Sequence, residues 1–157
     1  MSEAAEKLDD YRETILEFQG PPPFRVDLRR PVSATERAAL ARVGLVEPFA
    51  VLTAENPCGE HADDAPTAAV ADARESRNQR RTARLLDHLE RVGAPAVRVD
   101  GVAPGGDHRE RCVATPADRA AGVALAKRFE QIALFWFDGR RFWLLPAESD
   151  GEPQALP

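Results

Sequence analysis

Apolar residues recur in the first third of the chain at spacings that separate helices from strands. Intervals of four and three residues predict an amphipathic helix over residues 4–18, with one stripe formed by Ala4, Leu8, Tyr11, Ile15 and Phe18. The prolines at 21–23 end this helix, and alternating apolar and polar residues over 24–28 predict a half-buried strand. Ser33 and Glu36 have the spacing of a capping box, so we expect a helix over 33–43.

The rest of the chain alternates between strand-like and helix-like patterns. A continuous apolar run at 49–53 predicts a central strand covered on both faces. After a long acidic connection, which residues 67–73 could shorten by extending the next helix, a helix is expected over 76–92. Short strands follow at 96–99 and 110–114, then a helix over 115–128 that begins at Thr115. Residues 132–137 and 140–145 flank Asp138 and Gly139, the signature of a β-hairpin.

This order of elements predicts an α/β (α+β) fold. We expect a mixed sheet of about six strands with about four helices packed on it, right-handed crossovers and a C-terminal β-hairpin. Residues 1–146 are assigned to a single α/β domain, and residues 147–157 to a flexible C-terminal tail.

Composition narrows the class of protein. The 157 residues are 43% hydrophobic and 30% charged, as in a globular protein, and the net charge of −5 argues against a nucleic-acid partner. No apolar run reaches the ~20 residues of a membrane helix, and the first residues lack a signal-peptide pattern. We therefore expect a cytoplasmic protein, not inserted in a membrane, with reduced cysteines.

A polar residue faces the core at the start of the helix predicted for 76–92. Asn78 lies on the same side as Leu85 and Leu89, at 100° per residue. A buried amide must be hydrogen-bonded, and the polar groups that follow the central strand, at residues 53–56, are the nearest candidates.

Basic residues crowd the same helix start. Of the 21 basic residues only Lys7 and Lys127 are lysines, and residues 77–84 hold four arginines, including Arg81 at the flank of the core-facing side. A helix N-terminus beside the end of a strand favours anions, so one interpretation is a pocket for a small anionic or nucleotide-like ligand. In the alternative, Asn78 ties a loop to the sheet and the arginines neutralise the acidic connection.

Histidine and cysteine offer two further interpretations. His108, Glu110 and Cys112 share one strand face by alternation, which suits either acid/base chemistry or a structural salt-bridged surface. Two cysteines and two histidines are also the ligand complement of a tetrahedral zinc site, although 46 residues separate its halves: Cys58, His61, His108 and Cys112. Scattered surface and core positions are the alternative.

The predicted hairpin concentrates aromatic residues on both of its faces: Phe135, Trp136, Phe137, Phe142 and Trp143. An exposed apolar patch of this size is rare in monomers, so either the first helix covers it or a second subunit does. The second case would make the hairpin, residues 132–145, the surface of a homodimer or of a protein–protein interaction or regulatory module.

Several segments of the chain form one combined pattern: residues 49–57, Asn78 with the basic residues after it, Glu110, and residues 126–134. Over about residues 49–137 this pattern resembles one bacterial family, the domain of unknown function 3293. It implies that the family's motif positions are Thr53, Asn56, Asn78, Arg81, Glu110, Phe129 and Gln131. The chain departs from the pattern at Arg111, at Glu130, where a glycine is expected, and at Ile132. The resemblance brings no reaction and no cofactor.

The sequence therefore predicts a ligand site between the strand exit at 53–57 and the helix start at 76–84. Its candidate ligand-binding residues are Thr53, Glu55, Asn56, Asn78, Arg81, Glu110 and Gln131. No catalytic residue is assigned.

Overall fold

The computed structural model describes residues 8–59, 66–148 and 151–157. Residues 8–11 are helical, and the other helices are α2 (Ala34–Arg42), α3 (Ala68–Arg91), α4 (Arg119–Arg128) and the 3-10 turn η1 (Pro57–Gly59). The strands are β1 (Ile15–Phe18), β2 (Phe24–Asp27), β3 (Phe49–Thr53), β4 (Val97–Val102), β5 (Arg109–Pro116), β6 (Ala133–Phe137), β7 (Phe142–Pro146) and β8 (Gln154–Ala155).

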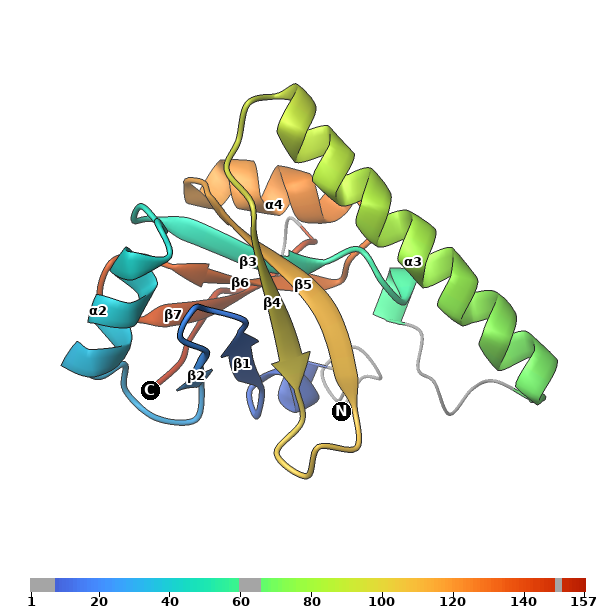
Figure 1. Ribbon diagram of the computed structural model, residues 1–157, viewed down its shortest axis with the longest axis horizontal. Coiled ribbons are helices and arrows are strands. Elements are labelled where there is room, and N and C mark those ends of the chain that lie inside the picture. The colour runs from blue at the N-terminus through green and yellow to red at the C-terminus, as the bar shows by residue number, and fades with distance from the viewer. Residues whose placement is uncertain (1–7, 60–65, 149–150) are drawn as a thin grey trace.

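All eight strands belong to one curled sheet (Figure 1) in the order β2-β1-β4-β5-β3-β6-β7-β8. Every neighbouring pair is antiparallel, so the α+β class is confirmed, but the expected mixed sheet of about six strands is wrong. Right-handed crossovers join parallel strands, and this sheet has none among its paired strands.

The central strand prediction is confirmed by β3, whose five residues are all buried. It lies between β5 and β6, and its side chains alternate between two hydrophobic cores. Phe49 and Val51 face a core that also contains residues of β1, β2 and α2. Ala50 and Leu52 face the second core, where Leu85 of α3 and other residues of α3 and α4 cover the sheet.

The helix boundaries follow their caps. Ser33 and Glu36 form the expected capping box at α2. Helix α3 is capped at Thr67 and is longer than expected, and its N-terminal end extends beyond the sheet (Figure 1). Helix α4 is capped by Asp118, not by Thr115, which lies in β5 because the ladder with β3 continues to Pro116.

Residues 15–18 are a strand, so the helix predicted over 4–18 is wrong at its C-terminal end. Pairing with β2 on one side and β4 on the other gives this segment two ladders of hydrogen bonds, which outweigh its helical spacing. Leu16 and Phe18, two residues apart, are the buried positions. Residues 4–7 lie outside the described residues.

Residues 154–156, within the segment that we predicted to be a flexible tail, lie against the sheet. β8 pairs with β7, and the Leu156 side chain that follows is 1% exposed. Burial of this leucine in the first core supplies the apolar contact that tethers the segment.

The aromatic hairpin is formed as predicted, and its own chain covers most of it. Phe137 and Phe142 contact Phe49 with ring centroids 5.2 and 5.8 Å apart, and the Arg37 guanidinium of α2 lies over Phe137. Tyr11 packs edge-on against Phe135, 6.1 Å away. The exposed patch that motivated a homodimer or interaction module is therefore largely absent.

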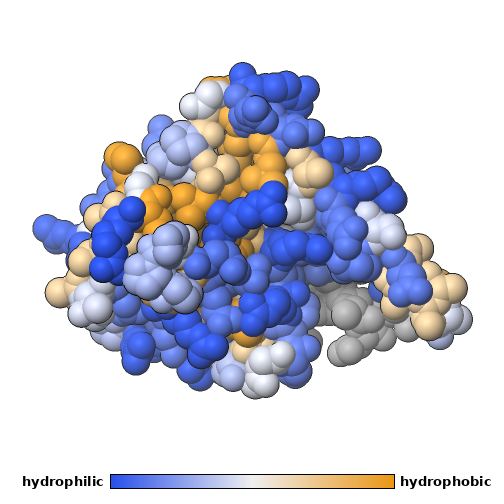
Figure 2. Space-filling model, in the orientation of Figure 1, coloured by the Kyte–Doolittle hydropathy of each residue, from blue (hydrophilic) through white to orange (hydrophobic). Residues whose placement is uncertain are grey.

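None of the described helices combines the length and the apolar character needed to cross a membrane. Figure 2 shows that hydrophilic side chains line most of α3 on the face in view.

Candidate functional site

The chain leaves β3 through a polar turn that is fastened to α3. Asn56 has a φ of 48°, and its backbone N–H donates to Asn78 Oδ1 at 3.0 Å. Asn78 Nδ2 donates in return to Asn56 Oδ1, also at 3.0 Å. The core-facing amide of α3 is thus satisfied by one of the partners that the sequence indicated, and its side chain is only 6% exposed.

Two further predicted residues hold backbone carbonyls around this turn. Arg81 Nε donates to the Ala54 carbonyl at 2.6 Å, and the other guanidinium nitrogens donate to the Phe129 carbonyl and to Glu130. Gln131 Nε2 donates to the Glu55 carbonyl at 2.9 Å. These bonds join the end of β3 to the end of α4. In our alternative interpretation the arginines neutralise the acidic connection, whereas Arg81 here binds two backbone carbonyls and Glu130.

The Glu55 carboxylate also has hydrogen-bond partners within the protein. Its carboxylate accepts from the backbone N–H of Arg111 at 2.6 Å and from the Arg111 guanidinium at 2.8 Å. The same guanidinium donates to Glu75 of α3 at 2.7 Å, and these two carboxylates raise the pKa of Arg111. Arg111 therefore pins α3 to β5.

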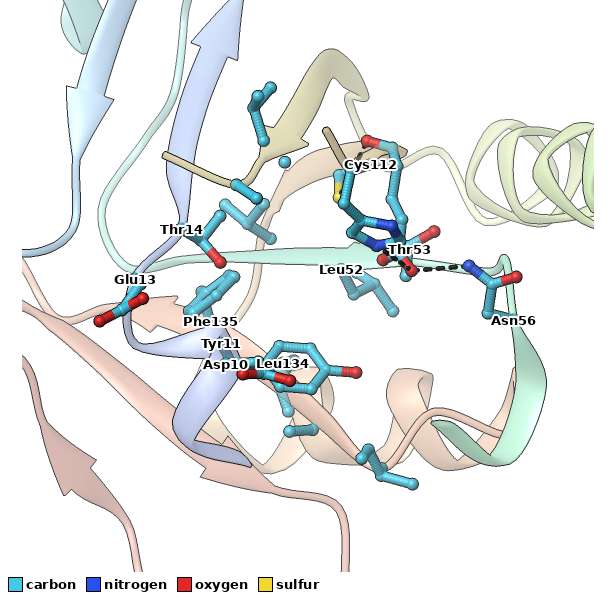
Figure 3. A pocket seen from close by; sticks show the side chains of 18 of the residues that line it. Asp10, Tyr11, Glu13, Thr14, Leu52, Thr53, Asn56, Cys112, Leu134 and Phe135 are labelled. Carbon is cyan, nitrogen blue, oxygen red and sulfur yellow. Dashed lines mark hydrogen bonds and ion pairs between the residues drawn. The ribbon is translucent and has the colours of Figure 1, made fainter. Parts of the chain in front are cut away.

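A cavity of about 350 Å³ lies on the opposite face of the sheet from α3 and α4. Its walls come from residues 10–14, from β3, from the β4–β5 connection, and from the start of β6. In the close view of Figure 3, the Tyr11 ring extends into this space, with Thr53 and Asn56 at one end. The volume is within the roughly 300–1,000 Å³ range of small-molecule sites.

Glu110 of β5 lines the cavity with one carboxylate oxygen already occupied. Oε1 accepts from Asn56 Nδ2 at 2.7 Å and is 3.3 Å from His108 Nε2. Within the described part of the chain, Oε2 receives no hydrogen bond, and the side chain keeps 19% of its surface exposed. Asn56 therefore links α3, on one face of the sheet, to a carboxylate at the cavity on the other face.

The cavity changes the acidity of three groups. The hydrogen bond to Glu110 raises the pKa of His108 above its usual 6.5, with burial acting in the opposite direction. Burial, followed by the charge of Glu110, raises the pKa of both Tyr11 and Cys112. At neutral pH Tyr11 is an uncharged hydroxyl, and Cys112 is a protonated thiol rather than a nucleophile.

A family model described as "Protein of unknown function (DUF3293)" matches residues 52–134, more than half of the chain. The chain belongs to the DUF3293 family. This confirms the resemblance drawn from the sequence motifs. No curated protein and no solved structure matches the chain.

The positions that the resemblance implies as motif positions divide into two groups in this chain, apart from Phe129, which packs in the second core. Thr53, Asn56 and Glu110 line the cavity. The motif residues Asn78, Arg81 and Gln131 bind the backbone or Asn56 behind it, as does the non-motif Glu55. We predicted a pocket for an anionic ligand beside Arg81. In the structure all three guanidinium nitrogens of Arg81 donate to protein acceptors instead.

One departure from the family pattern has a physical explanation. Glu130, at the position where DUF3293 is expected to have glycine, has a φ of 58°. This left-handed conformation favours glycine. The Glu130 carbonyl accepts from the Cys58 N–H at 2.7 Å, so the unusual backbone joins the end of α4 to η1.

Sequence reasoning missed the wall formed by residues 10–14. The apolar stripe over residues 4–18 predicts that Tyr11 packs on the core. It gives no sign that the Tyr11 hydroxyl lies at a cavity. The same residues bring Asp10 and Glu13 to the cavity. No local pattern marks these residues, because they meet β5 only through the folded sheet.

The four candidate zinc ligands are not brought together in the described structure. Cys58 is exposed in η1, whereas Cys112 is buried in β5. His61 lies outside the described residues. Among the residues that the structure describes, no group of three or more His, Cys, Asp and Glu side chains is arranged to hold a metal ion.

Proposed function

We propose that the cavity between Tyr11, Thr53 and Glu110 binds a small molecule. The observation that carries the proposal is the position of Glu110, which lines the cavity with one carboxylate oxygen fixed and the other without a described partner. A ligand contact for that second oxygen would complete its hydrogen bonding.

The hydrogen bonds that connect Asn78, Asn56 and Glu110 support a binding role for the cavity. The Asn78 amide holds Asn56 through two hydrogen bonds, and Asn56 in turn holds Glu110. Such a chain fixes the orientation of a carboxylate before any ligand arrives, which reduces the entropy cost of binding.

The apolar part of the cavity supports it as well. Val51, Ile132 and Phe135 are among its lining residues, and they offer contact area for a ligand body. Small-molecule sites combine such apolar walls with a few oriented polar groups.

Ligand-observed NMR with a panel of one-ring and two-ring fragments tests the proposal. The panel holds ammonium, neutral and carboxylate members in equal numbers. Gly101→Val is the cavity-filling variant, because a Cβ at this position would meet Cys112 Sγ at 3.4 Å and Thr14 Cγ2 at 3.6 Å, ordinary contact distances that use up space in the cavity.

We expect fragments that bind the wild type and bind Gly101→Val at least tenfold more weakly. Gly105→Val, the same exchange at an exposed position of the adjacent loop, is the control and should keep the wild-type hits. Thermal melts verify that both variants are folded. If the folded wild type binds no fragment, or if Gly101→Val binds the same fragments equally well, the cavity is not a ligand site.

A further inference from the structure

The charged side chains that line the cavity are predominantly negative. They belong to Asp10, Glu13, Asp107, Glu110 and His108, all of which are exposed except the half-buried Glu110. Among the described residues that line it, none is an arginine or a lysine. Four carboxylates against one histidine give a local charge between −4 and −3, depending on whether His108 is protonated.

The acidity of the lining groups agrees with this negative potential. The hydrogen bond to Glu110, and then the charges of Glu110, Asp107 and Glu55, raise the pKa of His108. Burial is the main cause of the raised pKa of Tyr11, and the charges of Glu110 and Asp10 add to it. A carboxylate or phosphate ligand would enter against this field, whereas a cation would be attracted by it.

The geometry of Glu110 restricts the type of cation. A guanidinium or amidinium binds best to both oxygens of a carboxylate at once. At Glu110 the Oε1 atom already accepts from Asn56 and contacts His108, which leaves Oε2 for the ligand. No donor among the described residues reaches Oε2, and a single available oxygen suits an ammonium, which is a point charge with single N–H donors.

The apolar residues of the cavity wall indicate the chemistry of the rest of the ligand. Phe135, Ile132 and Val51 line the cavity beside the carboxylate. The Tyr11 ring extends over the same space (Figure 3). An ammonium group on an aromatic or branched aliphatic body would pair its charge with Glu110 and bury its apolar part on these side chains.

We infer that the ligand of this cavity is an amine with an apolar body, whose ammonium group donates to Oε2 of Glu110. This inference rests on the proposed binding function. The cavity defines the site, and the carboxylates and the single free oxygen decide the chemical class of ligand.

Four compounds on one scaffold test the inference: 2-phenylethylamine, 2-phenylethylguanidine, 2-phenylethanol and 3-phenylpropanoate. Dissociation constants are measured by NMR titration at pH 7 and low salt with the full chain. We expect 2-phenylethylamine to bind about tenfold tighter than the alcohol. Both can donate to the Glu110 carboxylate, but only the ammonium carries a charge that this carboxylate attracts. The guanidine should bind more weakly than the amine, and the carboxylate weakest of all.

Glu110→Gln keeps an oxygen for Asn56 Nδ2 but removes the charge, so it should remove most of the preference for the amine over the alcohol and weaken the alcohol less than the amine. Asp10, Glu13 and Asp107 remain in the lining of this variant. Glu90→Gln, an exposed carboxylate on α3, is the control and should retain the preference. Suppose that the alcohol or the carboxylate binds as tightly as the amine, and that Gly101→Val weakens this binding. The amine inference is then wrong, while the binding site stands. If fragments bind in neither experiment, the binding site itself is refuted.

Discussion

Asn78→Leu should destabilise the protein although leucine is apolar and forms helices well. Asn78 is 6% exposed, and the substitution leaves the Asn56 N–H without its acceptor and Asn56 Oδ1 without its donor. Each buried polar group left unsatisfied costs about 1–3 kcal/mol, and the half-buried position of Asn56 favours about 1.2 kcal/mol for each group. Two such losses, less about 0.5 kcal/mol for the better helix propensity of leucine, give a net loss of about 2 kcal/mol.

Urea denaturation followed by circular dichroism measures this change in the free energy of unfolding. For a chain of this length, about 2 kcal/mol corresponds to a fall in Tm of roughly 4–8 °C. Gln79→Leu, the neighbouring exposed amide on α3, is the matched control and should change the free energy of unfolding by less than about 0.5 kcal/mol. Equal stability of the two variants would refute the assigned role of Asn78 as the fastening between α3 and the exit of β3.

Three other predictions concern neighbouring parts of the structure. Arg81→Met should cost about 2–4 kcal/mol in urea denaturation, because two backbone carbonyls lose a charged donor, and Arg81→Lys should recover less than half of that loss. Gly122→Val should destabilise by about 1–3 kcal/mol, since a Cβ there would lie 3.0 Å from a side chain of the sheet; the exposed Ala121→Val is the control, and equal melting of the two would argue against close packing of α4. In an NMR titration His108 should have a pKa above 6.5 that falls in Glu110→Gln; because the pKa is raised in the folded state, its contribution to stability is complete below about pH 6.5 and is lost as the pH rises through the folded-state value. An unchanged His108 pKa in that variant would exclude the ion pair as its cause.

Local signals in the sequence are sufficient to predict elements that depend only on neighbouring residues or on burial. The capping box at Ser33 needs only four consecutive residues, and the buried strand β3 needs only an uninterrupted apolar run. The same holds for Asn78, because its helical phase beside Leu85 and Leu89 already places the amide at the core.

Features that depend on distant pairing could not be predicted in this way. Ile15 and Phe18 fit a helical stripe equally well, and only ladders with β2 and β4 select the strand. The cavity unites segments around Tyr11, Thr53 and Glu110 that are far apart along the chain. The negative charge of the cavity could not be predicted either, because Asp10 and Glu13 reach it from a segment that no local pattern marks. A helical wheel likewise does not show that the Arg81 guanidinium turns toward the Ala54 and Phe129 carbonyls.

A titration of the isotopically labelled full chain with 2-phenylethylamine, followed by amide chemical shifts, tests the central claim most directly. The account predicts saturable shifts concentrated at cavity residues of β4 and β5, such as Gly101 and Cys112. Glu110→Gln should weaken the affinity for the amine about tenfold. Saturable shifts that map instead to the outer face of α3, or the absence of saturable shifts with a folded protein, would contradict it.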